Sequence, residues 1–317
     1  MRSLTLPAGW MRWGLLVALT CLVVAPLVLP EYAVILLTQS LAYAIAAMSL
    51  DVLIGYAGLA SLGHAAFFAI GAYATAIGVT QHQASFPAAV ILSALAGAAA
   101  SALAAPLALR AAGIYFLMIT LAIAMCVWGL AFRWGSLTGG DNGITGIPRP
   151  DLGLGWNLGI AVHFYYLSLG FFLACLGLLY LLVRSPFGKS LIGIRDSESR
   201  MRVLGYNVWL HKFLAMVIAG GFAGLAGCLY AYFNSFVSPN DANIGQCMEL
   251  VLMVSLGGPA TLVGASLGAA VIVFLKHMVS VYTKRWLMVL AAVYVASALY
   301  APEGILGLLT KADGRAK

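Results

Sequence analysis

The sequence predicts an all-α membrane protein that crosses the bilayer about ten times. Of its 317 residues, 63% are hydrophobic and only 9% are charged, whereas a soluble domain carries about 25% charged residues. Apolar runs of about 20 residues, the length of a spanning helix, recur along the chain. Basic residues gather in short loops between these runs, as in cytoplasmic loops of membrane proteins. We therefore expect one transmembrane domain over residues 1–317, with broken or re-entrant segments where the runs are short or rich in glycine.

The predicted spans follow the apolar runs in order. They cover approximately residues 13–29, 32–54, 62–79, 86–109, 114–132, 160–183, 213–233, 246–256, 261–279 and 286–299. A signal peptide is the alternative for the first run, but the run is long for one and no clear cleavage site follows. The eighth run is short and contains Glu249, and a re-entrant segment there would move the basic tail to the other side of the membrane.

Two polar intervals set the expected topology. Residues 133–159 are dense in glycine, asparagine, aspartate and proline, which is turn chemistry, and we expect them to form an exterior loop. Residues 184–212 carry six basic side chains and are expected on the cytoplasmic side together with both termini. Only Lys284 and Arg285 then fall outside against the rule.

Each interval has a functional and a plain interpretation. The exterior loop is either a docking or gating surface or a solvent-exposed connector. In the cytoplasmic loop, residues 196–199 resemble a helix start, and a short helix before Gly205 could act as a lever for another subunit. The alternative is a solvated loop that only satisfies the positive-inside rule.

The stretch 51–71 is the first candidate for a substrate path. Asp51 and His64 are ionisable groups at or near membrane depth, where function is the usual explanation. Glycines between them free backbone groups that are tolerated where they line a wet cavity, although close helix packing or a helix-end turn would also explain them. A hydrogen-bonded His64 and an interfacial Asp51 are the plain alternatives. Glu249 likewise precedes a glycine-rich break. The predicted path residues are Asp51, Tyr56, Gly58, Ser61, His64, Glu249, Gly257 and Gly258.

The motifs of several protein classes are absent from the sequence. Its basic residues form no stripe with interleaved aromatics, so we expect no nucleic-acid partner. It has no G-x-x-x-x-G-K-[ST] loop for ATP, no H-E-x-x-H and no C-x-x-C, so we expect no catalytic residue, no metal site and no cofactor bound by this chain. The energy for active transport would have to come from another subunit.

Several long motifs resemble one transporter family. They are GYAGLASLGHAAFFAIGAYATA (55–76), TGGDNGITGIP (138–148), the stretch 184–231 beginning RSPFGKSLIG, ELVLMVSLGGPATLVGASLGAA (249–270) and APEGILGLL (301–309). The chain is similar over most of its length to the permease subunits of branched-chain amino-acid ABC importers, and most similar to the M-type subunit. The resemblance implies the ABC-importer permease fold of about ten helices in the cell inner membrane.

The resemblance also implies partners. These are ABC ATPase subunits, which use the ATP, an H-type sister permease that completes a heterodimer, an external substrate-binding protein and membrane lipid. The coupling motif of the family corresponds here to Ser185, Pro186, Phe187, Gly188, Arg195, Asp196, Glu198, Arg200, Arg202 and Gly205. Two departures are visible: residues 199–201 read Ser-Arg-Met where the family usually has an alanine pair, and Ala60 stands where glutamine is frequent.

The expected function is import of branched-chain or other hydrophobic amino acids, driven by a separate ATPase. Related permeases serve urea, short amides or organic carboxylates, so these substrates remain an alternative. A second class is an ion-coupled secondary transporter that uses Asp51, His64 and Glu249 as a relay. A passive channel for a small neutral solute is the third.

Overall fold

The computed structural model describes residues 20–150 and 158–283, together with 285, 288–289, 291–293, 295 and 304. Of the first predicted span, residues 20–28 are described and are helical. Most of the tenth predicted span and the basic tail lie outside the described residues.

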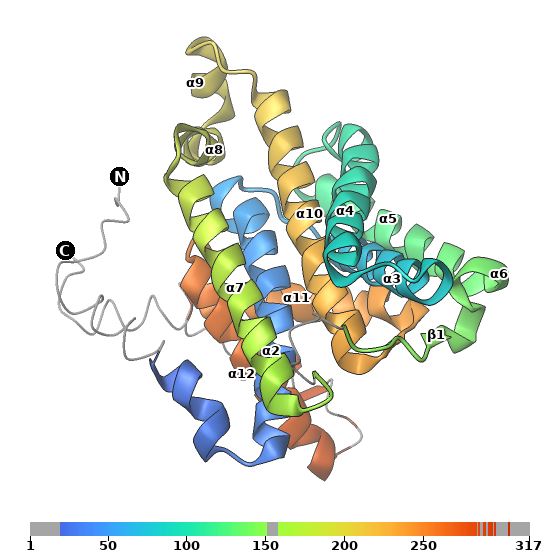
Figure 1. Cartoon of the computed structure of the whole chain (residues 1–317). Coiled ribbons are helices and arrows are strands. Elements are labelled where there is room, and N and C mark those ends of the chain that lie inside the picture. The colour runs from blue at the N-terminus through green and yellow to red at the C-terminus, as the bar shows by residue number, and fades with distance from the viewer. Residues whose placement is uncertain are drawn as a thin grey trace.

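The described chain is mainly helical (Figure 1). The longer helices are α2 (Glu31–Asp51), which continues as the π-helix η1 (Val52–Tyr56), α3 (His64–His82), α4 (Phe86–Ala108), α5 (Ile114–Arg133), α7 (Ala161–Arg184), α10 (Val208–Asn234), α11 (Ile244–Gly257) and α12 (Leu262–Tyr282). The shorter elements are α6 (Gly135–Thr138), η2 (Gly140–Asn142), β1 (Ile144–Thr145), α8 (Pro186–Asp196), α9 (Glu198–Val203), β2 (Phe236–Val237) and η3 (Pro239–Ala242).

Six of the described helices are long and apolar enough to cross a membrane. They are α2 with η1, α4, α5, α7, α10 and α12. Helix α11 has 14 residues, about 21 Å at 1.5 Å per residue, which is shorter than the roughly 30 Å hydrocarbon core. The chain is thus a multi-pass membrane protein with a short apolar helix at the predicted eighth run.

The start of the predicted seventh helix differs most from the observed one. Helix α10 begins at Val208 rather than at 213, because the Asn207 side chain caps it by accepting a hydrogen bond from the Leu210 amide at 3.0 Å. The last five residues of the predicted loop 184–212 therefore belong to α10. The apolar run alone placed the start too late, since the first turn contains the polar residues His211 and Lys212.

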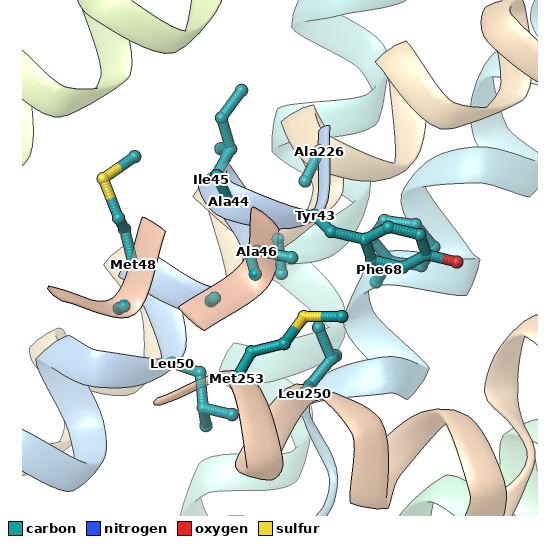
Figure 2. Packing of buried hydrophobic residues seen from close by; sticks show 14 of the residues in the cluster. Tyr43, Ala44, Ile45, Ala46, Met48, Leu50, Phe68, Ala226, Leu250 and Met253 are labelled. Atoms are coloured by element: carbon teal, nitrogen blue, oxygen red, sulfur yellow. The ribbon is translucent and has the colours of Figure 1, made fainter. Parts of the chain in front are cut away.

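Helix α2 is the centre of the molecule. It packs against α7, α10 and α12 (Figure 1), and every residue from Ser40 to Leu53 is buried. Figure 2 shows part of this core, in which Tyr43 of α2 lies against Phe68 of α3, with Ala226 of α10 and Leu250 and Met253 of α11 close by. A helix apolar on all sides is expected in such a buried position.

Small residues allow α10 to approach its neighbours closely. A Cβ atom on Gly224 of α10 would overlap the carbonyl of Ser93 in α4, and one on Gly71 of α3 would overlap the backbone of Gly224. Such close contacts between backbones are typical of membrane helix interfaces. At Gly71, therefore, the packing interpretation of the glycine-rich stretch is confirmed.

The two polar intervals lie at opposite ends of α10. Helices α8 and α9 directly precede it, and β2 and η3 directly follow it. Strand β2 pairs antiparallel with β1, with Ile144 opposite Val237, so the predicted exterior loop is tied to the turn after α10. Because α10 has 27 residues, these two regions are about 40 Å apart along its axis. Figure 1 shows them at opposite ends of this helix.

Candidate functional site: the coupling segment and the break after α2

The predicted coupling segment consists of two short helices. Ser185 caps α8 by accepting a hydrogen bond from the Gly188 amide at 3.3 Å, and Pro186 occupies its first turn. Ser197 caps α9 in the same way, accepting from the Arg200 amide at 3.4 Å. The predicted helix start at residues 196–199 is confirmed. Helix α8 was not predicted, although serine followed by proline is a common helix start.

The two short helices pack as one unit. Met201 is buried, and its sulfur packs closely against Gly193. A Cβ atom on this glycine would lie 2.8 Å from the sulfur. Met201, Ile194 and Val208 form a small hydrophobic cluster that joins α8, α9 and the start of α10. Met201 stands where the resemblance leads one to expect part of an alanine pair, so this residue contributes to the internal packing of the segment.

The outer side of α9 is both basic and apolar. Arg200 and Arg202 are exposed, and Val203 and Leu204 are 88% and 69% exposed. Glu198 pairs with Arg202 at 3.3 Å and also with Lys212. Exposed apolar side chains surrounded by charges are typical of protein interaction sites.

Arg195, near the end of α8, contacts the broken end of α2. Its guanidinium group donates a hydrogen bond to the carbonyl oxygen of Gly55 in the π-helix. Three residues further on, Gly58 has a φ of +70°, and a Cβ atom there would lie 2.7 Å from Cγ of Arg195. Only glycine adopts this conformation without strain, so the backbone can pass directly against the arginine.

The same break holds the turn between α11 and α12. The Ala260 amide donates to Oδ1 of Asp51 at 2.8 Å, and the Tyr56 hydroxyl donates to the Ala260 carbonyl at 2.9 Å. A Cβ atom on Gly55 would overlap the Ala260 nitrogen. Asp51 is fully buried, and its Oδ2 has no hydrogen-bond partner among the described residues. The break after α2 therefore joins the coupling segment on one side to the α11–α12 turn on the other.

His64 occupies a separate buried position at the start of α3. Its Nε2 lies 2.7 Å from the hydroxyl of Ser49 in α2. The Ser49 hydroxyl also donates to the Ala46 carbonyl at 2.8 Å, and since a hydroxyl has one proton, Nε2 of His64 then carries the hydrogen. Its Nδ1 has no partner among the described residues. Nearby, Ser61 accepts a hydrogen bond from the Gly63 amide at 3.2 Å.

Glu249 of α11 forms a buried ion pair that the sequence reasoning missed. Its two carboxylate oxygens accept hydrogen bonds from Nζ of Lys276 in α12 at 2.9 and 3.0 Å. A buried carboxylate needs such a partner. Lys276 lies 27 residues away within an apolar run. A lysine inside a predicted span usually has a buried partner, and this was the signal in the sequence that could have revealed the pair.

The structure thus brings some predicted site residues together and separates others. Asp51 and Tyr56 meet Ala260, two residues after Gly258, whose φ is +108°. Gly58 lies against Arg195 instead. Gly257 is buried against Gly264 of α12. His64 pairs with Ser49, and Glu249 pairs with Lys276.

One stretch matches the sequence pattern of a hydrolase motif. Residues 264–268 read Gly-Ala-Ser-Leu-Gly, which fits G-x-S-x-G, and the motif requires a strand-to-helix turn that exposes the serine. Here the stretch lies inside the continuous helix α12, and the Ser266 hydroxyl donates to the Val263 carbonyl at 2.8 Å. The geometry of a nucleophile is not formed.

Comparison with known proteins places the chain in a family. The model of the branched-chain amino acid transport system / permease component family matches residues 32–298. The high-affinity branched-chain amino acid transport system permease protein LivM of Escherichia coli (strain K12) is 30% identical over 314 residues, covering 92% of this chain and 74% of that protein. LivM of Salmonella typhimurium is 29% identical with the same coverage.

A more distant likeness covers a shorter region. The autoinducer 2 import system permease protein LsrC of Salmonella paratyphi B is 32% identical over 110 residues, which is 32% of each chain. No solved structure matches the chain. The family model and the LivM relatives, which extend over most of the chain, show that it belongs to the family of permease components of branched-chain amino acid transport systems, a family of transport subunits and not of enzymes.

Proposed function

We propose that this chain is the M-type permease subunit of an ATP-driven importer of branched-chain or other hydrophobic amino acids in the cell inner membrane. ABC ATPase subunits bind and hydrolyse the ATP, and this chain binds no cofactor itself. An H-type sister permease completes the pore as a heterodimer, and an external binding protein delivers the substrate. The family, whose members named above transport branched-chain amino acids, supports this proposal.

The observation that carries the proposal is the contact between Arg195 and the break after α2. The coupling segment exposes the basic and apolar surface of α9, which suits a partner protein, and its other side reaches the Gly55 carbonyl through Arg195. A movement of α8 would therefore displace the π-helix and, through Asp51 and Tyr56, the α11–α12 turn. An ATPase subunit bound to α9 would thus act on the break after α2, inside the membrane domain.

We further propose that the substrate path follows the two breaks. It would be lined by Asp51, Tyr56, Gly58, Ser61 and His64 from one break and by Glu249, Gly257 and Gly258 from the other. Support comes from the unpartnered polar atoms Asp51 Oδ2 and His64 Nδ1 among the described residues, because buried polar atoms normally have partners.

In the proposed topology, ten helices cross or enter the membrane and both termini are cytoplasmic. Residues 133–159 then face the exterior, and α8 and α9 face the cytoplasm. The separation of these regions along α10 supports this arrangement.

The short similarity to LsrC favours keeping the substrate class broad. That relative is a permease for autoinducer 2, so related chains carry solutes other than amino acids, and urea, short amides or organic carboxylates are the second candidates. The proton-relay alternative receives less support, because Asp51, His64 and Glu249 contact three different partners: the Ala260 amide, Ser49 and Lys276.

The test is uptake in proteoliposomes. The chain is reconstituted alone, and with its ATPase subunits, sister permease and binding protein, and uptake of labelled leucine is followed with ATP or with a non-hydrolysable analogue. We expect accumulation against a gradient only in the full assembly with ATP. Gradient-driven uptake by this chain alone would instead identify a secondary transporter, and equilibration without accumulation would identify a channel.

A further inference from the structure

Glu198, at the start of α9, joins the coupling segment to a second membrane helix. One of its carboxylate oxygens pairs with Arg202 of α9 itself at 3.3 Å, and the other pairs with Nζ of Lys212 in α10. The side chain of Lys212 is only 14% exposed, whereas that of Arg202 is 68% exposed. Solvent and salt therefore screen the pair with Lys212 less, and this pair is the one suited to holding two helices together.

Aromatic and apolar contacts surround this ion pair. The ring of His211 in α10 is stacked on Phe187 of α8, with centroids 5.6 Å apart and planes at 15°. Val208, at the start of α10, packs with Met201 of α9 and Ile194 of α8. Apolar packing has no preferred direction, so the ion pair is the contact that sets the direction of α9 relative to α10.

Helix α10 is suited to carrying a displacement across the membrane. It is a continuous α-helix of 27 residues, whereas α2 changes to a π-helix at Val52. Its backbone lies directly against two other helices. A Cβ atom on Gly227 would overlap the Phe68 carbonyl of α3, and the Ser101 hydroxyl of α4 donates to the Met216 carbonyl at 2.7 Å. Because closely packed interiors resist compression, a displacement of α10 should move α3 and α4 together with it.

The other end of α10 holds the predicted exterior loop. The Ser235 carbonyl, directly after the last residue of α10, accepts hydrogen bonds from the Gly146 and Ile147 amides at 3.1 and 3.3 Å. The Tyr230 hydroxyl of α10 donates to Oδ1 of Asp241 in η3 at 3.0 Å. The exterior loop and η3 are therefore attached to the same helix whose opposite end is attached to α9.

These contacts form a second connection from the coupling segment. We infer that Glu198 and Lys212 are positioning residues that transmit the movement of α9 to α10 and, through α10, to the exterior loop. This inference rests on the function proposed above. Arg195 acts on the break after α2, whereas the Glu198–Lys212 pair acts on the opposite end of the molecule, where the binding protein delivers the substrate. Since coupling between two sites is reciprocal, nucleotide on the ATPase subunits should change the affinity for the binding protein through this pair.

The test measures that change of affinity in the complete transporter, reconstituted with its partner subunits. The Kd of leucine-loaded binding protein is measured with and without a non-hydrolysable ATP analogue. In the wild type we expect the two values to differ at least about five-fold, a usual size of coupling between sites. In Glu198→Gln and in Lys212→Met the difference should fall below about two-fold, a reduction in the range found for residues on a coupling network.

Three further variants separate a positioning role from other roles. Lys212→Arg keeps the positive charge and should keep most of the wild-type difference. The double variant Glu198→Gln, Lys212→Met should lose no more than either single variant, because each removes the same contact. Lys189→Met is the matched control, since it removes an exposed lysine of α8 and should show the wild-type difference. All variants should retain the ATPase subunits during co-purification.

The outcomes distinguish this inference from the proposed function. A wild-type difference in both Glu198→Gln and Lys212→Met, or no difference in the wild type itself, would overturn the inference while ATP-driven import still stands. Loss of the ATPase subunits from Glu198→Gln would make Glu198 a docking contact and would overturn it as well. Failure of the wild-type assembly to accumulate leucine with ATP would overturn the proposed function instead.

Discussion

Asp51 shows how a buried charge is used to hold a backbone turn. Its carboxylate accepts a hydrogen bond from the Ala260 amide at 2.8 Å. Asp51→Ala should therefore lower stability by about 1–3 kcal/mol, because it leaves a buried N–H unpaired. Asp51→Asn should lose less, since the amide oxygen can still accept. Thermal unfolding of the purified protein in detergent measures both, and equal losses in the two variants would contradict the structural role.

His64 gives a second prediction at the scale of a residue. His64→Ala should lower uptake more than it lowers the amount of folded protein. The reason is that Nδ1, which has no partner among the described residues, is available to a substrate in the proposed path. The control is Ser101→Ala, which removes a buried hydroxyl that donates to the Met216 carbonyl at 2.7 Å and should lower only the folded amount. Parallel losses of uptake and folded protein in His64→Ala would leave His64 with a packing role alone.

At the scale of elements, α8 and α9 form a packed lever rather than a loop. Their two serine caps and the Met201 cluster give the segment a defined shape. Its outward residues are free to bind another protein, while Arg195 reaches inward to the break after α2. A rigid element with one contact on each side is suited to transmitting movement.

Charge reversal on α9 tests the outward side of this lever. The double variant Arg200→Glu, Arg202→Glu should lose the ATPase subunits during co-purification, because the exposed surface changes sign, while membrane insertion stays normal. Arg133→Glu is the control: it reverses an exposed charge at the end of α5, far along the chain from α9, and should keep the ATPase bound. Undiminished co-purification of the double variant would show that α9 is not the docking surface.

The elements were more predictable than their contacts. Hydropathy located α4, α5, α7 and α12 to within a few residues, because each is a continuous apolar run. The break after α2 was visible in its glycines, but its partners were not. Arg195 and Gly55 are 140 residues apart, Asp51 and Ala260 are 209 apart, and no local pattern encodes such pairs.

At the scale of the whole molecule, the fold separates two polar regions by the length of α10. The coupling segment precedes this helix, and the β1–β2 pair with η3 follows it. An importer needs this separation, because substrate is delivered on one side and energy on the other. The central position of α2, in contact with α7, α10 and α12, places the break between these regions.

Labelling from each side of the membrane tests this arrangement. Single cysteines at positions 200 and 240, both exposed, are introduced into a cysteine-free background. A membrane-impermeant maleimide added to intact cells or right-side-out vesicles should label position 240, and position 200 should react only after the membrane is opened. Labelling of both positions from the same side would rule out the proposed topology.

The most direct test of the account is the coupling ratio of the Arg195→Ala transporter, measured as leucine taken up per ATP hydrolysed. Lys189→Ala is the control, since it removes an exposed positive charge from the same helix. Because Arg195 links α8 to the break without belonging to the outward surface of α9, we expect the variant to keep its ATPase subunits and hydrolyse ATP while its uptake per ATP falls at least ten-fold. A ratio equal to that of the wild type and of Lys189→Ala would contradict the claim that movement reaches the membrane domain through this contact.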